Sequence, residues 1–343
     1  MVHSESRRSP TADTSAERAH YVQAYRWMLL ARVLDEKLAS LYRGGKIFGG
    51  VFLGRGQEAL SVSVGITLRK SDVFAPLIRD AAGRLAFGET VLDSVRTYLG
   101  SPLGPMRGRD GNVHRGKPRE GLLPMISHLG AMISVVNGTL IARRFKGVAD
   151  TVGAACIGEG ATSTGAVHEA LNQAAVEKLP LVLVVANNHY AYSTPAKHQF
   201  ACESLVDRAA GYGVEGHSVD GTDLSACLDT LGRAVQQARD GHGPQLVVAS
   251  LLRLCGHGEH DTAEYVDSRL KQSSVGRDCL DVASEQLLDR QWAEEKELDA
   301  WRRESLTRVD EAVAKTQREA PPDPYKEDWY ALSSKHLHDG HGE

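Results

Sequence analysis

Two groups of polar residues follow apolar runs in the middle of the chain. The run at 152–157 ends in Gly158-Glu159-Gly160, and the run at 181–186 ends in Asn187-Asn188. A helical pattern lies between them, so the segment predicts a strand–helix–strand unit with its polar groups past the carboxyl ends of two strands, where open α/β sheets bind ligands. Glycines and a helix N-terminus suit a phosphate, whereas carboxylate and amide oxygens suit magnesium. The segment therefore predicts a phosphate and cation site.

Two other segments add residues with matching chemistry. Arg79 follows a short apolar run at 73–78 and would neutralise a phosphate. His257 follows the run at 246–252 in a Gly-flanked loop and would donate a proton or a hydrogen bond. Each residue has an ordinary alternative: Glu159 can cap a helix, Asn188 can lie in a turn and His257 can be a loop residue. The convergence of four segments favours one site.

Other phosphate and metal motifs fail at single positions. A dinucleotide-binding fingerprint needs a third glycine where the chain has Ser163, and a P-loop needs lysine where it has Ala166. His168-Glu169 begins like a zinc motif, but Asn172 stands where the second histidine belongs. NAD, ATP and zinc are therefore disfavoured.

The composition is that of a globular protein. The 343 residues are 42% apolar and 24% charged, with a net charge of −4, so nucleic acid is not expected as a partner. Apolar runs are too short to span a membrane. Five cysteines without CxxC pairing favour a reducing cytosol. Residues 1–17 lack the apolar core of a secretory signal and predict a flexible tail, so a cytoplasmic location is expected.

Strands and helices alternate along the chain, which predicts an α/β fold with a mostly parallel sheet and helices on both faces. We expect one domain over 18–320 and a Pro-rich, polar tail over 321–343. The long irregular segment at 100–124 is expected to be functional. Strands are expected at 73–78, 152–157, 181–186, 214–219 and 246–252, and helices at 18–42, 57–68, 90–99, 125–145, 223–239 and 284–315. A further helix is expected to begin after Gly160 and to close at Pro180.

Six motifs in order resemble one enzyme family. They are GQEA, IRD, GRDGNVHRG, ISHLGA, GEG followed by NN, and GHG, within about residues 20 to 320. The 29 positions from Glu159 to Asn188 fit the thiamin-diphosphate motif. The chain is similar to the alpha subunit of the decarboxylating component of 2-oxo acid dehydrogenase complexes, whose members include pyruvate, acetoin and branched-chain enzymes.

The resemblance implies a site for thiamin diphosphate and magnesium. Glu159, the Asn188 side chain and the Tyr190 carbonyl would bind the metal, and His257 would be the catalytic histidine. Arg79 would contact the diphosphate. The residues implied to bind the cofactor are Arg79, His128, Leu129, Gly130, Gly158, Glu159, Gly160, Ala161, Asn188, Tyr190 and His257.

The resemblance also implies partners. In this family a beta subunit supplies the glutamate that activates the cofactor, so we expect a heterotetramer of two alpha and two beta chains and an inactive isolated alpha chain. A lipoyl-bearing acyltransferase would accept the acyl group. A branched-chain 2-oxo acid is favoured as substrate, followed by pyruvate. An acetoin enzyme and a non-catalytic cofactor-binding paralogue are the alternatives.

Three positions depart from the family pattern. Glu159 replaces the commoner aspartate, and branched-chain members of the family can also have glutamate at this position. Ile78 stands where many relatives have a tyrosine that contacts phosphate. Gly258 follows His257 where animal relatives have a regulatory serine, so phosphorylation control is not expected at that position.

Overall fold

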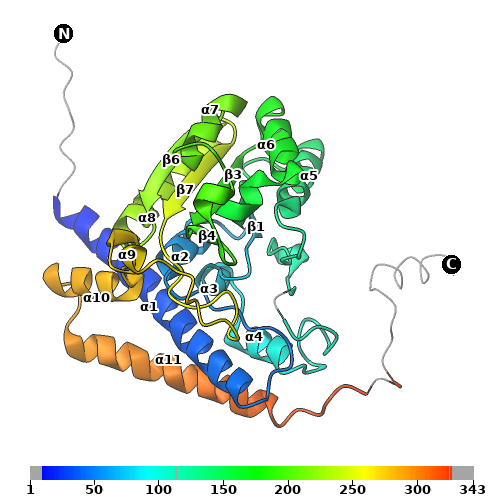
Figure 1. Cartoon of the computed structure of the whole chain (residues 1–343), viewed down its shortest axis with the longest axis vertical. Helices are drawn as coiled ribbons and strands as arrows, with labels where there is room; N and C mark the ends of the chain where they lie inside the picture. The colour runs from blue at the N-terminus through cyan, green and yellow to red at the C-terminus, as the bar shows by residue number, and fades with distance from the viewer. Residues whose placement is uncertain (1–9, 113, 324, 327–343) are drawn as a thin grey trace.

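The computed structural model describes residues 10–112, 114–323 and 325–326. A five-stranded parallel sheet lies at its centre, in the order β1-β2-β3-β7-β6 (Figure 1). A short antiparallel pair follows β3 along the chain. The α/β architecture predicted from the sequence is confirmed. The strands are β1 (Val73–Ala75), β2 (Gly153–Gly158), β3 (Leu181–Asn187), β4 (Tyr190–Ala191), β5 (Thr194–Pro195), β6 (Glu215–Asp220) and β7 (Gln245–Ser250).

The central strands are apolar along their whole length because helices cover both faces of the sheet. Leu183 and Val185 of β3 pack in a core with α5 (Ala131–Phe145) and α6 (Gly165–Val176). Val182 and Val184 pack on the opposite face, in a core with α2 (Glu58–Thr67) and α8 (Leu224–Arg239). Strands buried on both faces produce continuous apolar runs, which is the pattern at 152–157 and 181–186.

A helical layer packs beside the sheet and forms a third core around Met28 and Leu34 of the long helix α1 (Pro10–Arg43). Helix α11 (Glu295–Thr316) lies alongside α1 (Figure 1). Within the described residues no helix combines the length and apolarity needed to cross a bilayer. The layer also contains α3 (Ala81–Phe87), α4 (Val91–Tyr98) and α10 (Cys279–Asp289).

Several element boundaries differ from the predicted ones. Helix α1 begins at Pro10, so residues 10–17 are helical rather than part of a tail, and residues 1–9 lie outside the described residues. Helix α5 begins only after Gly130, whose φ of 86° is left-handed and interrupts a helix from residue 125. Helix α6 ends at Val176, before Pro180. Of the predicted C-terminal tail, residues 324 and 327–343 are not described.

Short elements complete the chain between the main helices and strands. The predicted helical region at 284–315 consists of two helices, α10 and α11. The remaining elements are α7 (Arg208–Tyr212), α9 (Ser268–Lys271) and the 3-10 turns η1 (Pro118–Glu120), η2 (Glu159–Ser163), η3 (Ala196–His198), η4 (Leu205–Asp207) and η5 (Ser274–Gly276).

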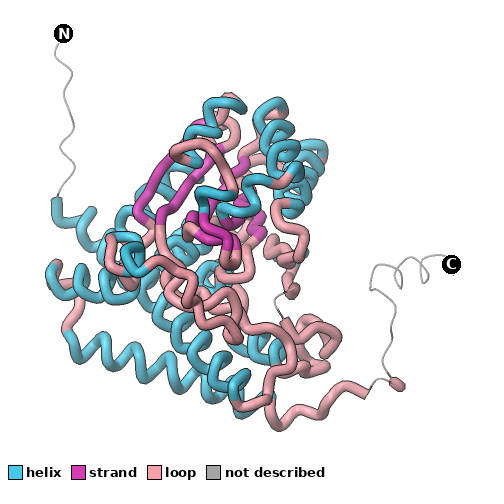
Figure 2. Tube along the Cα trace, in the orientation of Figure 1, coloured by secondary structure: helices cyan, strands magenta, loops and turns pink. Residues whose placement is uncertain are grey.

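The carboxyl ends of the parallel strands meet at one edge of the sheet. Loops gather beyond this edge, drawn in pink below the strands in Figure 2. The segments that leave β1, β2, β3 and β7 there carry the four residues predicted to form the site: Arg79, Glu159, Asn188 and His257.

Candidate functional site

The structure brings Glu159 and Asn188 into direct contact at the ends of neighbouring strands. Gly158 of β2 pairs with Ala186 of β3, so both strands end at the same level. The Asn188 backbone N–H donates a hydrogen bond to Glu159 Oε2 at 3.2 Å. Both residues are buried, with 1% of Glu159 and 8% of Asn188 exposed. The 29 positions from Glu159 to Asn188 in the sequence therefore bring these two residues together as a buried pair.

The Glu159 carboxylate lies in surroundings that favour a bound cation. Burial raises its pKa, and the Asn188 N–H and the Gln199 side-chain amide lower it. Gln199 Nε2 donates to Glu159 Oε1 at 3.3 Å, while Gln199 Oε1 is buried without a hydrogen-bond partner. A buried carboxylate whose hydrogen bonds to Asn188 and Gln199 are long, next to an unpaired amide oxygen, is the kind of donor set that a hard cation would complete.

A cation at this place would need more than protein carboxylates. Among the described residues, no three His, Cys, Asp or Glu side chains are grouped so that they could hold a metal ion. One carboxylate, amide and carbonyl oxygens, and oxygens of a phosphate ligand are the usual partners of magnesium. The donor set around Glu159 and Asn188 fits a magnesium ion that also binds a phosphate.

A tight turn follows Asn188. His189 has a left-handed φ of 68°, and Asn188 Oδ1 accepts a hydrogen bond from the Tyr190 N–H at 3.3 Å. The Tyr190 ring is buried, and its hydroxyl accepts from the Asp267 N–H at 3.1 Å. The turn therefore holds Asn188 and Tyr190 close together, while the Tyr190 carbonyl as a metal ligand stays a prediction.

Arg79 joins three segments at the site. Its Nη1 donates to the Leu53 carbonyl at 2.9 Å, and its Nη2 donates to the His257 carbonyl at 2.6 Å. Burial, with only 6% of the residue exposed, lowers the Arg79 pKa to about 10, so the side chain is still a cation at neutral pH. The glycine-rich loop at 49–56, the end of β1 and the loop after β7 thus meet at one buried guanidinium.

The structure holds His257 as a neutral ring beside Arg79. Its Nδ1 lies 3.5 Å from Arg79 Nη2, and because a guanidinium only donates, Nδ1 accepts and the proton is assigned to Nε2. Burial first, and then the charges of Arg79 and Arg253, lower the His257 pKa to about 4. The rings of Tyr192 and Phe52 lie against the imidazole, with centroids 4.4 and 5.5 Å away. His257 therefore presents an Nε2–H donor at neutral pH.

A hydrogen-bond network behind His257 was not predicted from the sequence. Arg253 Nη2 donates to the Tyr265 hydroxyl at 2.6 Å and to the Tyr192 carbonyl at 3.0 Å. The Tyr265 hydroxyl donates to Asp261 Oδ2 at 2.5 Å, and the same carboxylate oxygen accepts from the His257 N–H at 2.6 Å. The density of polar residues in 253–265 was the available signal. The network fixes the loop that carries His257.

The other predicted cofactor residues lie at the same edge of the sheet. A Cβ on Gly153, at the start of β2, would lie 3.0 Å from the side chain of Leu140, in the second half of α5, so α5 runs antiparallel to β2. His128 and Leu129, both exposed, therefore lie at the amino end of α5 near the carboxyl edge. A Cβ on Gly130 would come within 2.6 Å of the Val167 side chain, so this glycine allows α5 to pack against α6. The roles of all three residues toward a cofactor stay predictions.

The segment after β2 differs from the predicted strand-to-helix connection. Gly160 and Ala161 lie in the 3-10 turn η2, and α6 begins only at Gly165, so the expectation of a helix N-terminus directly after Gly160 is wrong. Thr164 has an extended conformation, which separates the turn from the helix. A Cβ on Gly158 would meet nothing within 4 Å, so there is open space where β2 ends.

The long segment at 100–124 reaches this edge through its histidine. His114 Nδ1 lies 2.7 Å from Asp110 Oδ2, and His114 Nε2 lies 3.1 Å from the Ser127 hydroxyl. Ser127 directly precedes His128 in the ISHLGA motif. The GRDGNVHRG motif is thereby connected to the segment predicted to line the cofactor.

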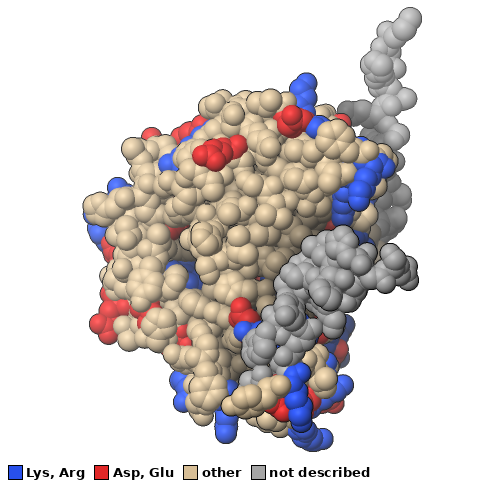
Figure 3. All heavy atoms as spheres, turned by 90° about the vertical axis from the view of Figure 1, so that its right-hand side faces the viewer, with Lys and Arg blue, Asp and Glu red and all other residues tan. Residues whose placement is uncertain are grey.

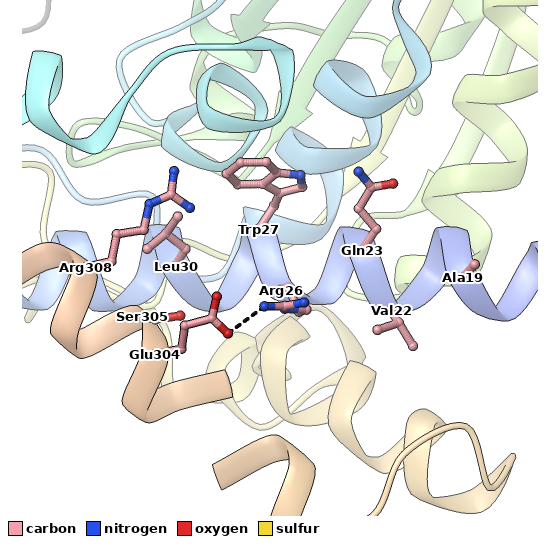
Figure 4. Close-up of a pocket in the computed structure, with 9 residues that line it drawn as sticks. All are labelled: Ala19, Val22, Gln23, Arg26, Trp27, Leu30, Glu304, Ser305 and Arg308. Atoms are coloured by element: carbon pink, nitrogen blue, oxygen red, sulfur yellow. Dashed lines mark hydrogen bonds and ion pairs between the residues drawn. The ribbon is translucent and has the colours of Figure 1, made fainter. Parts of the chain in front are cut away.

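A separate groove of about 530 Å³ lies on the helical layer, away from the predicted site (Figure 4). It runs between α1 and α11, where Arg26 bonds Glu304 at 2.6 Å and the Arg308 guanidinium lies over the Trp27 ring. None of the residues predicted to bind cofactor or metal lines this groove. The chemistry is therefore assigned to the edge of the sheet.

Residues 25–325 match the family described as Dehydrogenase E1 component. The chain belongs to this family. It is 33% identical over 305 residues to the alpha subunit of acetoin:2,6-dichlorophenolindophenol oxidoreductase from Cupriavidus necator, covering 89% of this chain and 91% of that one. It is 31% identical over 303 residues to the pyruvate dehydrogenase E1 component subunit alpha of Rhizobium meliloti, covering 88% and 87%.

A third relative is the 2-oxoisovalerate dehydrogenase subunit alpha of Bacillus subtilis, at 36% identity over 242 residues, covering 70% of this chain and 73% of the relative. All three relatives are alpha subunits. The resemblance to E1 alpha subunits that the motifs predicted is therefore confirmed. Their substrates differ, although their identities to this chain are similar.

Proposed function

We propose that the chain is the alpha subunit of an enzyme that uses thiamin diphosphate and magnesium to decarboxylate a 2-oxo acid oxidatively and to transfer the acyl group to a lipoyl group. The observation that carries the proposal is the buried contact between Glu159 and Asn188, in a member of the E1 family. Arg79 and His257 meet at the same edge of the sheet and supply the charge and hydrogen bonding that such a site needs.

In this proposal each residue acts on the ligand in a distinct way. Glu159, the Asn188 side chain and the Tyr190 carbonyl hold magnesium, and Arg79 neutralises the diphosphate. Thiamin diphosphate bound there would supply a carbon nucleophile and an electron sink for decarboxylation of the 2-oxo acid. His257 donates a hydrogen bond from Nε2 to the substrate or to the incoming lipoyl group.

The proposed assembly contains two alpha and two beta chains, and a lipoyl-bearing acyltransferase receives the product. The face formed by α5 and α6 supports burial against another chain. Figure 3, which looks onto that side, presents mainly uncharged atoms between charged margins. Ser134, Val135 and Gly138 of α5 are exposed and uncharged. Faces that become buried in permanent assemblies are usually poor in charge.

A branched-chain 2-oxo acid is the substrate we favour. Relatives named for branched-chain substrates are 36% identical in Bacillus subtilis and 34% identical over 282 residues in Mycobacterium tuberculosis. Glu159 in place of aspartate agrees with this choice. Acetoin is the second candidate, because the acetoin relative from Cupriavidus necator matches over a larger share of the chain, 89%.

A substrate panel tests the proposal. The chain would be co-expressed with its beta partner and supplied with thiamin diphosphate, magnesium and the dye 2,6-dichlorophenolindophenol. We expect dye reduction with 2-oxoisovalerate at a kcat/KM at least about tenfold above that with pyruvate or acetoin. A preference for acetoin or pyruvate would correct the substrate, and no cofactor-dependent turnover of any of the three would overturn the proposed function.

A further inference from the structure

A single peptide group of the glycine-rich loop lies between two buried charged side chains. Its carbonyl, from Leu53, accepts a hydrogen bond from Arg79 Nη1 at 2.9 Å. Its N–H, from Gly54, donates to Asp35 Oδ2 at 2.7 Å. No peptide bond among the described residues is cis, so the N–H and the carbonyl point in opposite directions. Asp35 and Arg79 are therefore connected through one peptide plane.

This peptide group helps to set the direction of the Arg79 guanidinium. The Leu53 carbonyl holds Nη1, and the His257 carbonyl holds Nη2 at 2.6 Å. An acceptor oxygen bonded to the N–H side of a peptide polarises the peptide and strengthens its carbonyl as an acceptor. The interaction with Asp35 thus stabilises the orientation of Arg79 without touching it.

The packing leaves the loop little freedom to take another path. A Cβ on Gly54 would lie 2.4 Å from the Arg79 carbonyl oxygen, and one on Gly56 would lie 2.5 Å from the Leu252 carbonyl oxygen. The Gly56 N–H donates to Glu58 Oε2 at 2.8 Å, and Arg32 pairs with that glutamate at 2.6 Å. Two buried carboxyl groups, from Asp35 and Glu58, therefore hold two amides of the same loop.

Asp35 is an acidic residue in the interior, and its carboxyl group accepts a hydrogen bond from the Gly54 N–H. It projects from α1 with 5% of its surface exposed, beside a small cavity that is lined by apolar residues such as Leu38 and also by Arg84 and Arg115. Burial raises its pKa to about 7, against the lowering effect of the Gly54 N–H. Burying such a group costs free energy, so its presence is explained by what it bonds.

We propose that Asp35 is a positioning residue for cofactor binding, which acts through the peptide group of Leu53 and Gly54 to hold Arg79 in the direction that receives the diphosphate. The inference rests on the proposed function, because it takes Arg79 as the diphosphate contact. Asp35 itself touches neither substrate nor cofactor.

The test measures the dissociation constant of thiamin diphosphate, with magnesium in excess, in the alpha–beta complex by titration calorimetry. Asp35→Ala removes the acceptor, and Asp35→Asn keeps an oxygen that can accept from the Gly54 N–H. We expect about tenfold weaker binding for Asp35→Ala, as for the loss of one buried hydrogen bond, and binding within about threefold of wild type for Asp35→Asn. At saturating cofactor, kcat should change by less than about threefold in both.

Asp72→Asn is the matched control. Asp72 is fully buried and accepts from the Val152 N–H at 2.9 Å, at the opposite edge of the sheet, where it pairs with Arg239. This variant should lose thermal stability and keep wild-type affinity. Wild-type affinity in Asp35→Ala, or equal weakening in Asp35→Asn and Asp35→Ala, would overturn the inference. A wild-type complex that fails to bind thiamin diphosphate would instead overturn the proposed function.

Discussion

At the scale of single residues, the site is a collection of buried charges whose partners are fixed by the fold. Arg79 is held by two backbone carbonyls, and Glu159 accepts two long hydrogen bonds. Groups of this kind have shifted pKa values, and such shifts concentrate at functional sites. The chemical state of each group can therefore be tested directly.

His257 should titrate far below an ordinary histidine. Its pKa is lowered to about 4 by burial and by Arg79 and Arg253, so we expect the ring to be neutral from pH 6 to 8 in the chain without cofactor. Between pH 4 and 6.5 the unfolded chain binds more protons at this position, so its contribution to stability is present above pH 6.5 and is lost as the pH falls through 4. Histidine NMR, assigned with His257→Asn, measures the pKa; a value near 6.5 would contradict the described packing.

Gly54→Ala should disturb Arg79 from the other side of the peptide group. The new methyl would lie 2.4 Å from the Arg79 carbonyl oxygen, so the loop must move. We expect binding of thiamin diphosphate to weaken by about tenfold or more, measured by calorimetry in the alpha–beta complex. Gly232→Ala in α8, where a Cβ meets nothing within 4 Å, is the control and should leave binding unchanged. Unchanged binding in both variants would show that the loop accommodates the methyl.

The four residues named from the sequence could be found because each follows a strand. Asp35 and Gln199 could not be found in the same way. A charged residue within a helix predicts a solvent-exposed position, and Asp35 is buried because the loop after α1 and the helices α3 and α4 pack over it. Gln199 reaches Glu159 from 40 positions further along the chain. Contacts of this kind depend on packing rather than on local pattern.

At the scale of elements, the strands buried on both faces were the easiest to predict and the helices shaped by packing were the hardest. Helix α3 was missed because AAGRLAF is short and contains Gly83. That glycine is required by the close approach of α2: a Cβ on it would lie 2.4 Å from the Ser61 carbonyl oxygen. Glycine has a low helix propensity, and the packing of α3 against α2 compensates for this cost.

A buried cluster of charges joins α3, the start of α4 and the long segment at 100–124. Glu89 accepts from both Arg84 and Arg115, and all three are at most 5% exposed. Glu89→Ala leaves two buried guanidiniums without their carboxylate, so we expect a loss of about 3–5 kcal/mol in the free energy of unfolding, measured by urea denaturation. Glu120→Ala, at an exposed position in η1, should cost less than about 0.5 kcal/mol.

The same cluster has a defined pH dependence. Although burial acts in the opposite direction, Arg115 and Arg84 lower the Glu89 pKa to about 2. Because this pKa lies below the unfolded value of 4.5, the stabilisation is fully present above pH 4.5 and is lost as the pH falls toward 2. The stability difference between wild type and Glu89→Ala should shrink over that range, and a constant difference would exclude this ion pairing.

At the scale of the whole molecule, the chain is expected to provide half of an active site. The side that carries α5 and α6 has mainly uncharged atoms between charged margins and supports association with a beta chain (Figure 3). Light scattering of the co-expressed chains should give the mass of two alpha and two beta subunits. The isolated chain should show less than about 1% of the turnover of the complex. Full turnover by the isolated chain would contradict the expectation that a beta chain is required for activity.

The most direct test of the central claim is the titration of thiamin diphosphate into the alpha–beta complex, with and without magnesium, for wild type and Glu159→Gln. We expect wild type to bind tightly only with magnesium, and Glu159→Gln to lose at least about a hundredfold in affinity because the buried metal ligand has lost its charge. Glu311→Gln, at an exposed glutamate on α11, should bind as wild type does. Magnesium-independent binding, or wild-type affinity in Glu159→Gln, would contradict the assignment of Glu159 and Asn188 as the metal site.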